Sequence, residues 1–444
     1  MRSLSFAGWT ASLVAIVCAA AHAGEETPLP FQSKQLHVGV ATCAGSNCHG
    51  SSQPFDDSTV QQNEYFSWQR KDAHSNAYKL LLSPAGRRIA GNLGIKSAEK
   101  APECLTCHTD YVAQAARGRR YQTSEGVSCE ACHGGSQDWL GPHVSGNTHA
   151  QNLAQGLYPL EDPVKRAEVC LHCHAGSAEK PIDHRMMGAG HPPLEFELDT
   201  FTAIEPAHFR VDKDYRSRKA YANDAQVWAA GQLVAARFFL NGLASARFTG
   251  RGMFPELAFF DCNACHHAMR PPRWNAGLAT PLGPGEVRLA DANLVIAAQI
   301  LDLVSPPGAK QWREALADLH RASGQSVNNV KEAAKKLRQI LGDTADRARD
   351  HRYTRQEVIA LMRQIATSGL ERDAGGYSAA KQIYYALDAL RVFLGKEQEV
   401  KSSALDHAVD QVFAAVDANN NYDPEAMRGG LRSVKAALAG LPPG

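Results

Sequence analysis

The pentapeptides Cys104-Leu-Thr-Cys-His108 and Cys129-Glu-Ala-Cys-His133 carry the pattern that decides the fold of this chain. Each has two cysteines separated by two residues and a histidine directly after the second cysteine. The pattern occurs twice more, and a longer C-x-x-x-x-C-H variant precedes all four. In chain order we number these motifs sites I to V: Cys43, Cys48 and His49; Cys104, Cys107 and His108; Cys129, Cys132 and His133; Cys170, Cys173 and His174; Cys262, Cys265 and His266.

The motifs account for almost all the cysteines of the chain. Of 11 cysteines, ten lie in the motifs, and Cys18 falls in an apolar N-terminal stretch. Zinc sites and disulfides also use cysteines, but neither requires a histidine after every second cysteine. Covalent haem attachment does, because two thioethers hold the porphyrin edge and the following imidazole binds the iron. The sequence therefore predicts five covalently attached haem c groups, with a looser loop at site I.

The first residues predict export. Arg2 is followed by an apolar stretch from Phe6 to Ala21, and Ala21-His22-Ala23 has the small-residue form of a cleavage site. The apolar stretch is short for a membrane anchor, and no later apolar run is long enough to span a bilayer. We expect a signal peptide over residues 1–23, cleaved near Ala23, a periplasmic mature protein and at most peripheral association with a membrane.

Charge and composition restrict the partners. The chain of 444 residues is 44% hydrophobic, which is enough for a large core, and its length predicts two domains. Removal of Arg2 with the signal peptide leaves 46 basic and 46 acidic side chains. This balance argues against a nucleic-acid partner, and haem propionates would make the loaded protein acidic. We expect redox proteins as partners; the sequence does not identify the donor or the acceptor and leaves oligomerisation open.

Histidines concentrate in the same part of the chain as the cysteines. Clustered histidines supply second axial ligands, so bis-histidine haems are the natural expectation. His172 lies inside the site IV motif and is poorly placed, while His267 directly follows the site V ligand and could reach only a neighbouring haem. The non-motif histidines of this region are His37, His74, His143, His149, His172, His184, His191, His208 and His267. The competing sulfur ligands are interpreted as packing around the porphyrins: Met186, Met187, Met253 and Met269.

Residues 24–275 are predicted to form a pentahaem cytochrome c domain with little regular structure. They are rich in glycine, proline, serine and short apolar runs, as expected where stacked porphyrins provide the core. One helix interrupts this region. Asn223 is its predicted N-cap, and Val227, Gly231, Val234 and Phe238 repeat at helical spacing. We interpret it as a scaffold helix leading to site V.

Residues 276–444 are predicted to form a separate α-helical bundle, so the whole fold should be mainly α. A proline-rich joint precedes it, at Pro271, Pro272, Pro281 and Pro284, and cysteine is absent from there on. Thr354 with Glu357 forms a predicted capping box, and Asp423 before Pro424 marks a helix start. Two apolar stripes indicate amphipathic helices: Trp312, Leu316 and Leu319, and then Val327, Val330, Ala334, Leu337 and Leu341.

Several strings between residues 43 and 275 resemble the multihaem cytochromes related to cytochrome c-554 and hydroxylamine oxidoreductase of nitrifying bacteria. The resemblance is carried by Ser67-Trp68 with His74, Cys104-Leu-Thr-Cys107-His108, Gly126-Val-Ser-Cys129-Glu-Ala-Cys132-His133-Gly134 with Trp139 and His143, Cys170-Leu-His-Cys173-His174, Met187-Gly-Ala-Gly-His191-Pro with Phe196-Glu197-Leu198, and Asp261-Cys262-Asn-Ala-Cys265-His266-His267.

The resemblance implies distal iron ligands at His74 and His143, with His184 and His191 as further ones. It also implies closely packed haems in parallel and perpendicular pairs. The chain departs from the cytochrome c-554 type, which has four haems, an ordinary first motif and no counterpart of the C-terminal helices. The ligand of the first haem and the role of the bundle are therefore left open.

Two functional classes follow from these features. The first is an electron carrier in which five mostly bis-histidine haems link redox partners. The second is an oxidoreductase that acts on a small nitrogen or sulfur compound at one five-coordinate haem, for which the sequence identifies no catalytic residue. No C-x-x-C-K motif is present, which counts against pentahaem nitrite reductase chemistry. A docking role for the helical bundle is a third hypothesis.

Overall fold

The structure, a computed structural model, describes residues 27–56, 60–250, 255–266, 282, 285–371, 376–417 and 422–441. Within these ranges the regular structure is helical, and the β pairing is confined to two isolated bridges, His37 with Arg117 and Phe260 with Leu289. The prediction of a mainly α fold is confirmed. The expected signal peptide and the proline-rich joint, except its flanks, lie outside the described residues.

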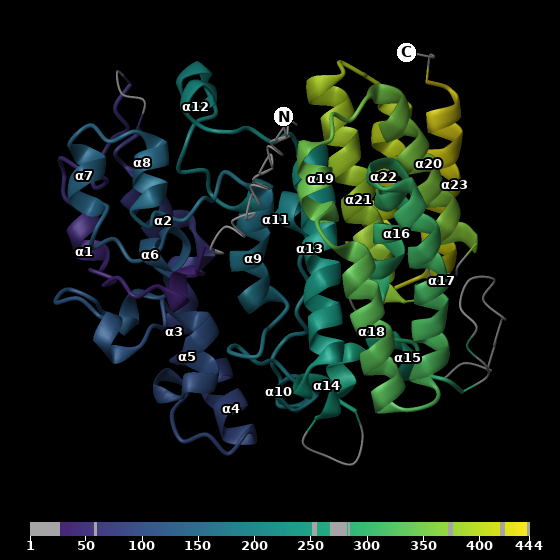
Figure 1. Ribbon diagram of the computed structural model, residues 1–444, viewed down its shortest axis with the longest axis horizontal. Coiled ribbons are helices and arrows are strands. Elements are labelled where there is room, and N and C mark those ends of the chain that lie inside the picture. The colour runs from purple at the N-terminus through teal and green to yellow at the C-terminus, as the bar shows by residue number, and fades with distance from the viewer. Residues whose placement is uncertain are drawn as a thin grey trace, which may run out of the picture.

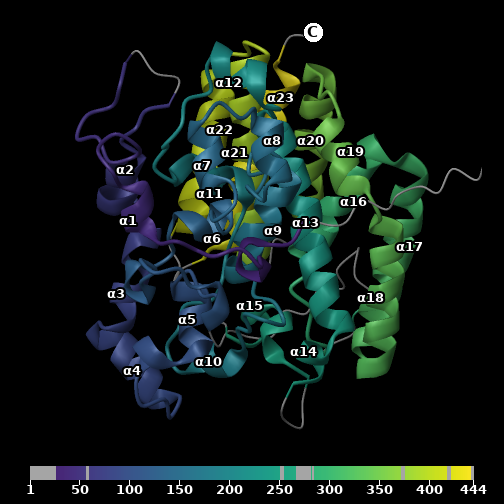
Figure 2. The same ribbon diagram turned by 60° about the vertical axis from the view of Figure 1, so that its left-hand side comes forward.

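The chain up to residue 223 forms short helices joined by loops. They lie together on one side of the molecule (Figure 1), with α1 to α4 along one edge in the turned view (Figure 2). The α-helices are α1 (Val40–Cys43), α2 (Glu64–Lys71), α3 (Ala77–Leu81), α4 (Pro84–Asn92), α5 (Pro102–His108), α6 (Cys129–His133), α7 (Leu140–Val144), α8 (His149–Ala154), α9 (Pro163–His174), α10 (His184–Gly188), α11 (Leu198–Ile204) and α12 (Lys213–Arg218). The 3-10 helices are η1 (Pro30–Gln32), η2 (Ala73–Asn76), η3 (Ala98–Lys100), η4 (Gln114–Ala116) and η5 (Thr123–Glu125).

Apolar side chains in the first part of this half form only a small cluster. Its buried members are Leu81, Ala90, Ala98, Ala101, Cys104 and Leu105. A cluster of this size cannot offset the conformational entropy of the loops around it, since ordering each residue costs about 1–2 kcal/mol for its backbone alone. The short helices therefore need another apolar body to pack against.

The rest of the chain forms longer helices. They are α13 (Asp224–Ala244), α14 (Ala246–Thr249), η6 (Leu257–Phe259), α15 (Cys262–Cys265), α16 (Ala292–Val304), α17 (Pro306–Ser323), α18 (Val327–Leu341), α19 (Thr344–Asp350), α20 (Arg355–Glu371), α21 (Tyr377–Glu397), α22 (Ser403–Asp417) and α23 (Pro424–Ala439). None of the helices in the described ranges is long and apolar enough to span a membrane.

The local signals read from the sequence in this half agree with the structure. The predicted apolar stripes are buried, apart from Val327, which is half-buried. Asn223 caps α13 in a capping box with Gln226. The Thr354 hydroxyl accepts from the backbone N–H of Glu357, and the backbone N–H of Thr354 donates to the Glu357 carboxylate, as a capping box requires. Asp423 caps α23, whose first residue is Pro424.

Helix α13 lies between the two halves of the molecule (Figure 1) and packs against helices of both, including α9, α16, α18, α19 and α21. It is buried on nearly every side, and Trp228, Leu233 and Leu240 have no exposed surface. The large apolar core is a single cluster of contacting side chains drawn from Val164 to Leu438, and this helix contributes to it. The domain boundary at residues 275 and 276 stays a prediction, whereas α13 belongs to the same core as the C-terminal helices.

Candidate haem sites

Four of the five motifs lie on short helical turns. Site II lies at the end of α5 and site IV at the end of α9, whereas site III forms the whole of α6. Helix α15 begins and ends at the cysteines of site V, and His266 is its C-cap. Helical spacing brings side chains three and four residues apart onto one face. Both sulfurs and the imidazole of a C-x-x-C-H motif therefore point to the same side. In site I the helix α1 ends at Cys43, and Cys48 and His49 follow in a turn.

Each motif histidine faces a second histidine from a distant part of the chain. The ring centres of the five pairs are separated by almost the same distance, between 6.1 and 6.4 Å. The pairs are His49 with His143 (6.3 Å), His108 with His191 (6.4 Å), His133 with His208 (6.4 Å), His174 with His74 (6.1 Å) and His266 with His184 (6.2 Å).

This separation fits one iron between two imidazoles. An imidazole nitrogen binds a transition metal at about 2.0 Å and lies about 1.1 Å from its ring centre, so rings on opposite sides of one iron have centres about 6.2 Å apart. Histidines that pack directly on aromatic rings come closer, as in the 4.7 Å between His351 and Tyr353 or the 4.9 Å between His172 and Phe238. The five pairs thus fit axial ligation of haem iron better than ring packing.

Hydrogen bonds orient six of the ten paired imidazoles through Nδ1. Carboxylates accept from two of them, His49 to Glu64 and His74 to Asp72, each at 3.0 Å. Backbone carbonyls accept from the other four: His108 to Ala77 (2.9 Å), His143 to Leu140 (2.5 Å), His191 to Pro192 (2.8 Å) and His208 to Pro206 (3.4 Å). A partner at Nδ1 fixes the tautomer that leaves Nε2 unprotonated for a metal.

Burial also favours the neutral imidazole at two of the motif histidines. It lowers the pKa of His133 to about 3 and that of His174 to about 4, so both imidazoles are neutral near pH 7. The pKa of His74 is raised instead, because Asp72 hydrogen-bonds its ring. Metal binding requires the neutral imidazole, so His133 and His174 are suited to bind iron without first losing a proton.

Cysteines of different sites lie close together. The sulfur of Cys43 in site I is within hydrogen-bonding reach of the sulfur of Cys129 in site III. The sulfur of Cys107 in site II is likewise within reach of the sulfur of Cys173 in site IV. All ten motif cysteines are free thiols in the structure. Porphyrins attached through these sulfurs would therefore be close neighbours.

Exposed apolar side chains lie beside the paired histidines. Val144 follows His143 and is 69% exposed, while Ile204 and Phe209 on either side of His208 are 70% and 42% exposed. Leu80 and Leu82 lie at the end of α3, the helix whose first residue, Ala77, accepts from His108, and both are also exposed. Apolar groups in these positions are suited to cover a porphyrin face, which is the apolar body that the short helices lack.

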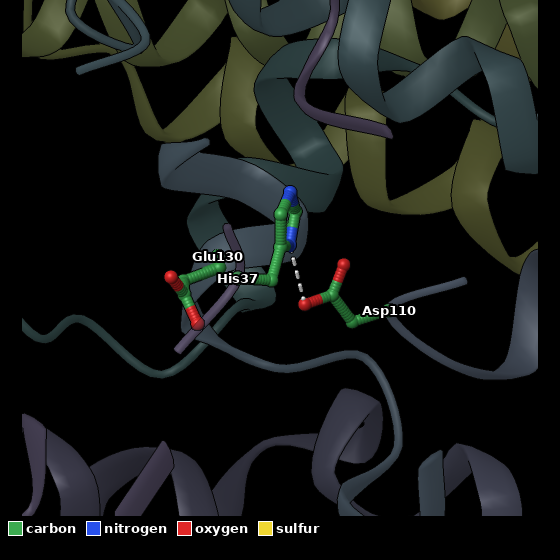
Figure 3. Close-up of side chains that lie close together, drawn as sticks. All are labelled: His37, Asp110 and Glu130. Carbon is green, nitrogen blue, oxygen red and sulfur yellow. Dashed lines mark hydrogen bonds and ion pairs between the residues drawn. The ribbon is translucent and has the colours of Figure 1, made fainter. Parts of the chain in front are cut away.

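His37 belongs to a different environment. It lies between Asp110 and Glu130 (Figure 3) and is fully buried. Its Nδ1 donates to Asp110 at 2.8 Å and its Nε2 to the carbonyl of Pro30 at 3.2 Å. Burial opposes the charged form, but Asp110 and Glu130 raise the pKa of His37 above its usual value. With both nitrogens donating, this imidazole has no lone pair for a metal and is a structural cation.

Glu130, inside the site III motif, connects two haem sites. Its carboxylate accepts from the backbone N–H groups of Val38 (2.9 Å), Gly39 (2.8 Å) and Ser136 (2.9 Å) and from the Ser136 hydroxyl (2.7 Å). Val38 and Gly39 lead directly into the helix of site I. One buried carboxylate thus holds the start of site I against site III.

The remaining histidines have other partners. His149 pairs with Glu161 at 2.6 Å, His320 with Asp291 at 2.7 Å, and His172 packs between Phe31 and Phe238. Of the methionines considered as ligands, Met186 is buried and Met187 half-buried, whereas Met253 and Met269 lie outside the described residues.

Four distal histidines expected from the sequence, His74, His143, His184 and His191, are each brought to a motif histidine. The fifth expected one, His267, lies outside the described residues. In its place the structure brings His208 to site III, a pairing that sequence reasoning missed. No motif surrounds His208, and nothing in the sequence separates it from the other unassigned histidines His37 and His149.

The helical fold and the haem-fitting sites relate the chain to the multihaem c-type cytochromes, a class of proteins that carry haem c and transfer electrons. Residues 42–134, which contain sites I to III, match the family model of cytochrome c554 and c-prime. The match confirms the relationship to multihaem c-type cytochromes that the motifs indicated. No curated protein and no solved structure matches the chain.

Proposed function

We propose that the protein is a periplasmic pentahaem cytochrome that passes electrons between redox partners through five bis-histidine haems. The observation that carries the proposal is the set of five histidine pairs, each with ring centres 6.1 to 6.4 Å apart. Every motif supplies two sulfurs and one member of a pair. Sites I to V would each hold one haem c, with the iron between the paired imidazoles and the porphyrin fixed by the two cysteines.

The neighbouring cysteines support a continuous electron path. Cys43 beside Cys129 brings site I to site III, and Cys107 beside Cys173 brings site II to site IV. The thiol of Cys132 is close enough to those of site IV to interact with them electrostatically, which links sites III and IV. We infer the spatial order V, II, IV, III, I, with electrons hopping between adjacent rings.

Site V joins this path through α10. His184, the first residue of α10, faces His266, and His191, just beyond its end, faces His108 of site II. The segment 184–191 would thus supply distal ligands to two haems. Site V would then stand at one end of the path, next to site II, and site I at the other.

The pairing favours a carrier over an enzyme. An oxidoreductase acting on a nitrogen or sulfur compound needs an iron with an open position, whereas each of the five motif histidines already has a partner in the described residues. The expected export signal, Arg2 with the apolar stretch and Ala21-His22-Ala23, supports a periplasmic location. Redox proteins are the proposed donor and acceptor.

The test is a haem count combined with ligand chemistry. We would produce the chain in a host competent in cytochrome c maturation and measure the intact mass, expecting five haem masses on a polypeptide that starts near Gly24. The double variant Cys262→Ala with Cys265→Ala should carry four. Visible and paramagnetic resonance spectra should show low-spin iron that is unchanged by hydroxylamine, nitric oxide or sulfite. A high-spin signal shifted by one of these compounds would support the enzyme instead.

A further inference from the structure

Asp72 lies directly behind one axial ligand of site IV. Its Oδ1 accepts from Nδ1 of His74 at 3.0 Å and from the backbone N–H of the same residue at 2.9 Å. Asp72 is also the N-cap of η2, the turn that carries His74, and its side chain is 8% exposed. The carboxylate is therefore fixed in place and poorly screened by water.

A second carboxylate faces the same imidazole. One ligand atom each from Asp72, His74 and Glu205 lie within 4.8 Å of one another. Glu205 follows α11, where its backbone N–H donates to the carbonyl of Phe201 at 3.0 Å. His74 thus has two acidic neighbours, of which Asp72 is hydrogen-bonded to Nδ1.

Site II provides the comparison within the same chain. Its imidazoles, His108 and His191, donate to the backbone carbonyls of Ala77 and Pro192 and to no carboxylate. The ring planes cross at 88° in this pair and at 90° in the pair of His74 and His174. Since the ring geometry is the same, the two haems would differ mainly in the groups behind the ligands.

Those groups bias the redox equilibrium. A carboxylate that accepts from an iron-bound imidazole raises the basicity of the ligand and stabilises ferric iron. Reduction adds an electron, which a nearby buried negative charge opposes. Lys180 acts in the other direction: its ammonium lies 3.3 Å from the sulfur of Cys173, at the attachment edge of site IV. Arg166 is a second cation near this edge, since it interacts electrostatically with the thiol of Cys170. The two carboxylates, in contrast, act at the axial ligand itself.

We propose that Asp72, reinforced by Glu205, sets the reduction potential of the site IV haem below that of the site II haem. The two carboxylates are tuning groups for a haem in the middle of the inferred path and do not bind the iron. Electrons that arrive through site II would therefore cross an uphill step at site IV before reaching site III. The inference rests on the proposed function, because it requires haems at both sites.

The test is a potentiometric titration of the haem-loaded protein, followed by visible and paramagnetic resonance spectroscopy. Asp72→Asn keeps an oxygen that can accept both hydrogen bonds while removing the charge. It should raise the potential of one haem by a tenfold change in its reduction equilibrium or more, which is 59 mV for one electron. Glu205→Gln should shift the same haem in the same direction by less, and Lys180→Met should shift it the opposite way.

Asp162→Asn is the matched control. Asp162 caps α9, the helix that carries site IV at its other end. Its carboxylate accepts from the backbone N–H of Val164 and from the guanidinium of Arg349. Asparagine caps helices as well as aspartate, so this variant loses the same charge without disturbing the fold. Its potentials should match those of the unaltered protein.

Unchanged potentials in Asp72→Asn, or an equal shift in Asp162→Asn, would overturn the inference while leaving a five-haem carrier intact. An unaltered protein without haem would instead overturn the proposed function. If Asp72→Asn lost the site IV haem, Glu205→Gln would decide the matter, because Glu205 is not hydrogen-bonded to His74 and can lose its charge without releasing the ligand. An unchanged potential in Glu205→Gln would then also count against the inference.

Discussion

The imidazole rings of His49 and His143 lie nearly parallel, with an interplanar angle of 7° and ring centres 6.3 Å apart. The ring planes of three other pairs are almost perpendicular: 88° for His108 with His191, 84° for His133 with His208 and 90° for His174 with His74. The pair His266 with His184 is intermediate at 30°. By the angle between their rings the histidine pairs fall into two classes, nearly parallel to moderately tilted and nearly perpendicular, and the haems that they would bind should differ accordingly.

These angles predict the paramagnetic resonance spectrum of the oxidised protein. Parallel imidazole planes separate two iron d orbitals in energy and give a rhombic low-spin signal, whereas perpendicular planes leave them nearly equal and give a highly anisotropic one. We expect two rhombic haems, at sites I and V, and three highly anisotropic haems. Integration of the two signal types in a frozen ferric sample measures the ratio. A spectrum with five rhombic signals would contradict the ligand geometry.

Replacement of His208 by alanine should open the iron of site III. Because His208 is the ring that faces His133, its loss should turn one low-spin haem into a high-spin, five-coordinate one that binds nitric oxide, with all five haems still attached. His407→Ala serves as control, since His407 is exposed on α22. If both variants remained fully low-spin, His208 would not be the ligand.

Removal of the Glu130 carboxylate should destabilise the haem half of the molecule. Glu130→Ala would leave three backbone N–H groups and the Ser136 hydroxyl without their acceptor, and each buried unsatisfied group costs about 1–3 kcal/mol. We expect a loss of at least about 3 kcal/mol in the free energy of unfolding by guanidinium. The exposed Glu103 of α5, changed to alanine in parallel, should alter it by less than about 0.5 kcal/mol.

The ion pairs of Asp291 should make the stability of the helical half depend on pH. Burial would raise the pKa of Asp291, but Arg288 and His320 outweigh it and hold that pKa below its usual value. A carboxyl group with a depressed pKa stabilises the fold above its unfolded pKa of about 3.9, and this contribution is lost as the pH falls through the folded value. Asp291→Asn should therefore be less stable at pH 6, and the difference should narrow as the pH falls below about 4. A difference that stayed constant from pH 6 to pH 3 would exclude this linkage.

The attachment sites could be predicted from the sequence because they are local. Two sulfurs and an imidazole must reach one porphyrin, so the residues stand within a few positions of one another in each motif. The helix caps at Asn223, Thr354 and Asp423 are local for the same reason, and all three are found where they were expected.

The assignment of distal ligands to haems could not be predicted in this way. His143 stands shortly after site III in sequence but faces His49 of site I, and His74, which precedes site II, faces His174 of site IV. These pairings depend on how the loops fold around one another. His208 lacked a motif altogether, and its role follows only from its position opposite His133.

Helix α13 shows a different limit of sequence reasoning. Its spacing predicted a helix, but the interpretation as a scaffold for site V missed its place in the main core. The run Val227-Trp-Ala-Ala-Gly-Gln-Leu-Val-Ala-Ala236 contains no charged residue, and a helix that is apolar on all sides is a buried one. That composition was a usable signal for its central position.

The small apolar cluster around Leu81, Ala90 and Leu105 has a consequence for biogenesis. Without porphyrin, the chain before Val164 has only this small apolar cluster to hold it together, whereas the chain from Val164 onward shares the large core. A newly made polypeptide would thus combine a folded C-terminal part with a loosely folded N-terminal part that stays accessible to the enzymes that attach haem. Each thioether would then contribute to folding, and chains without haem would be more susceptible to proteolysis.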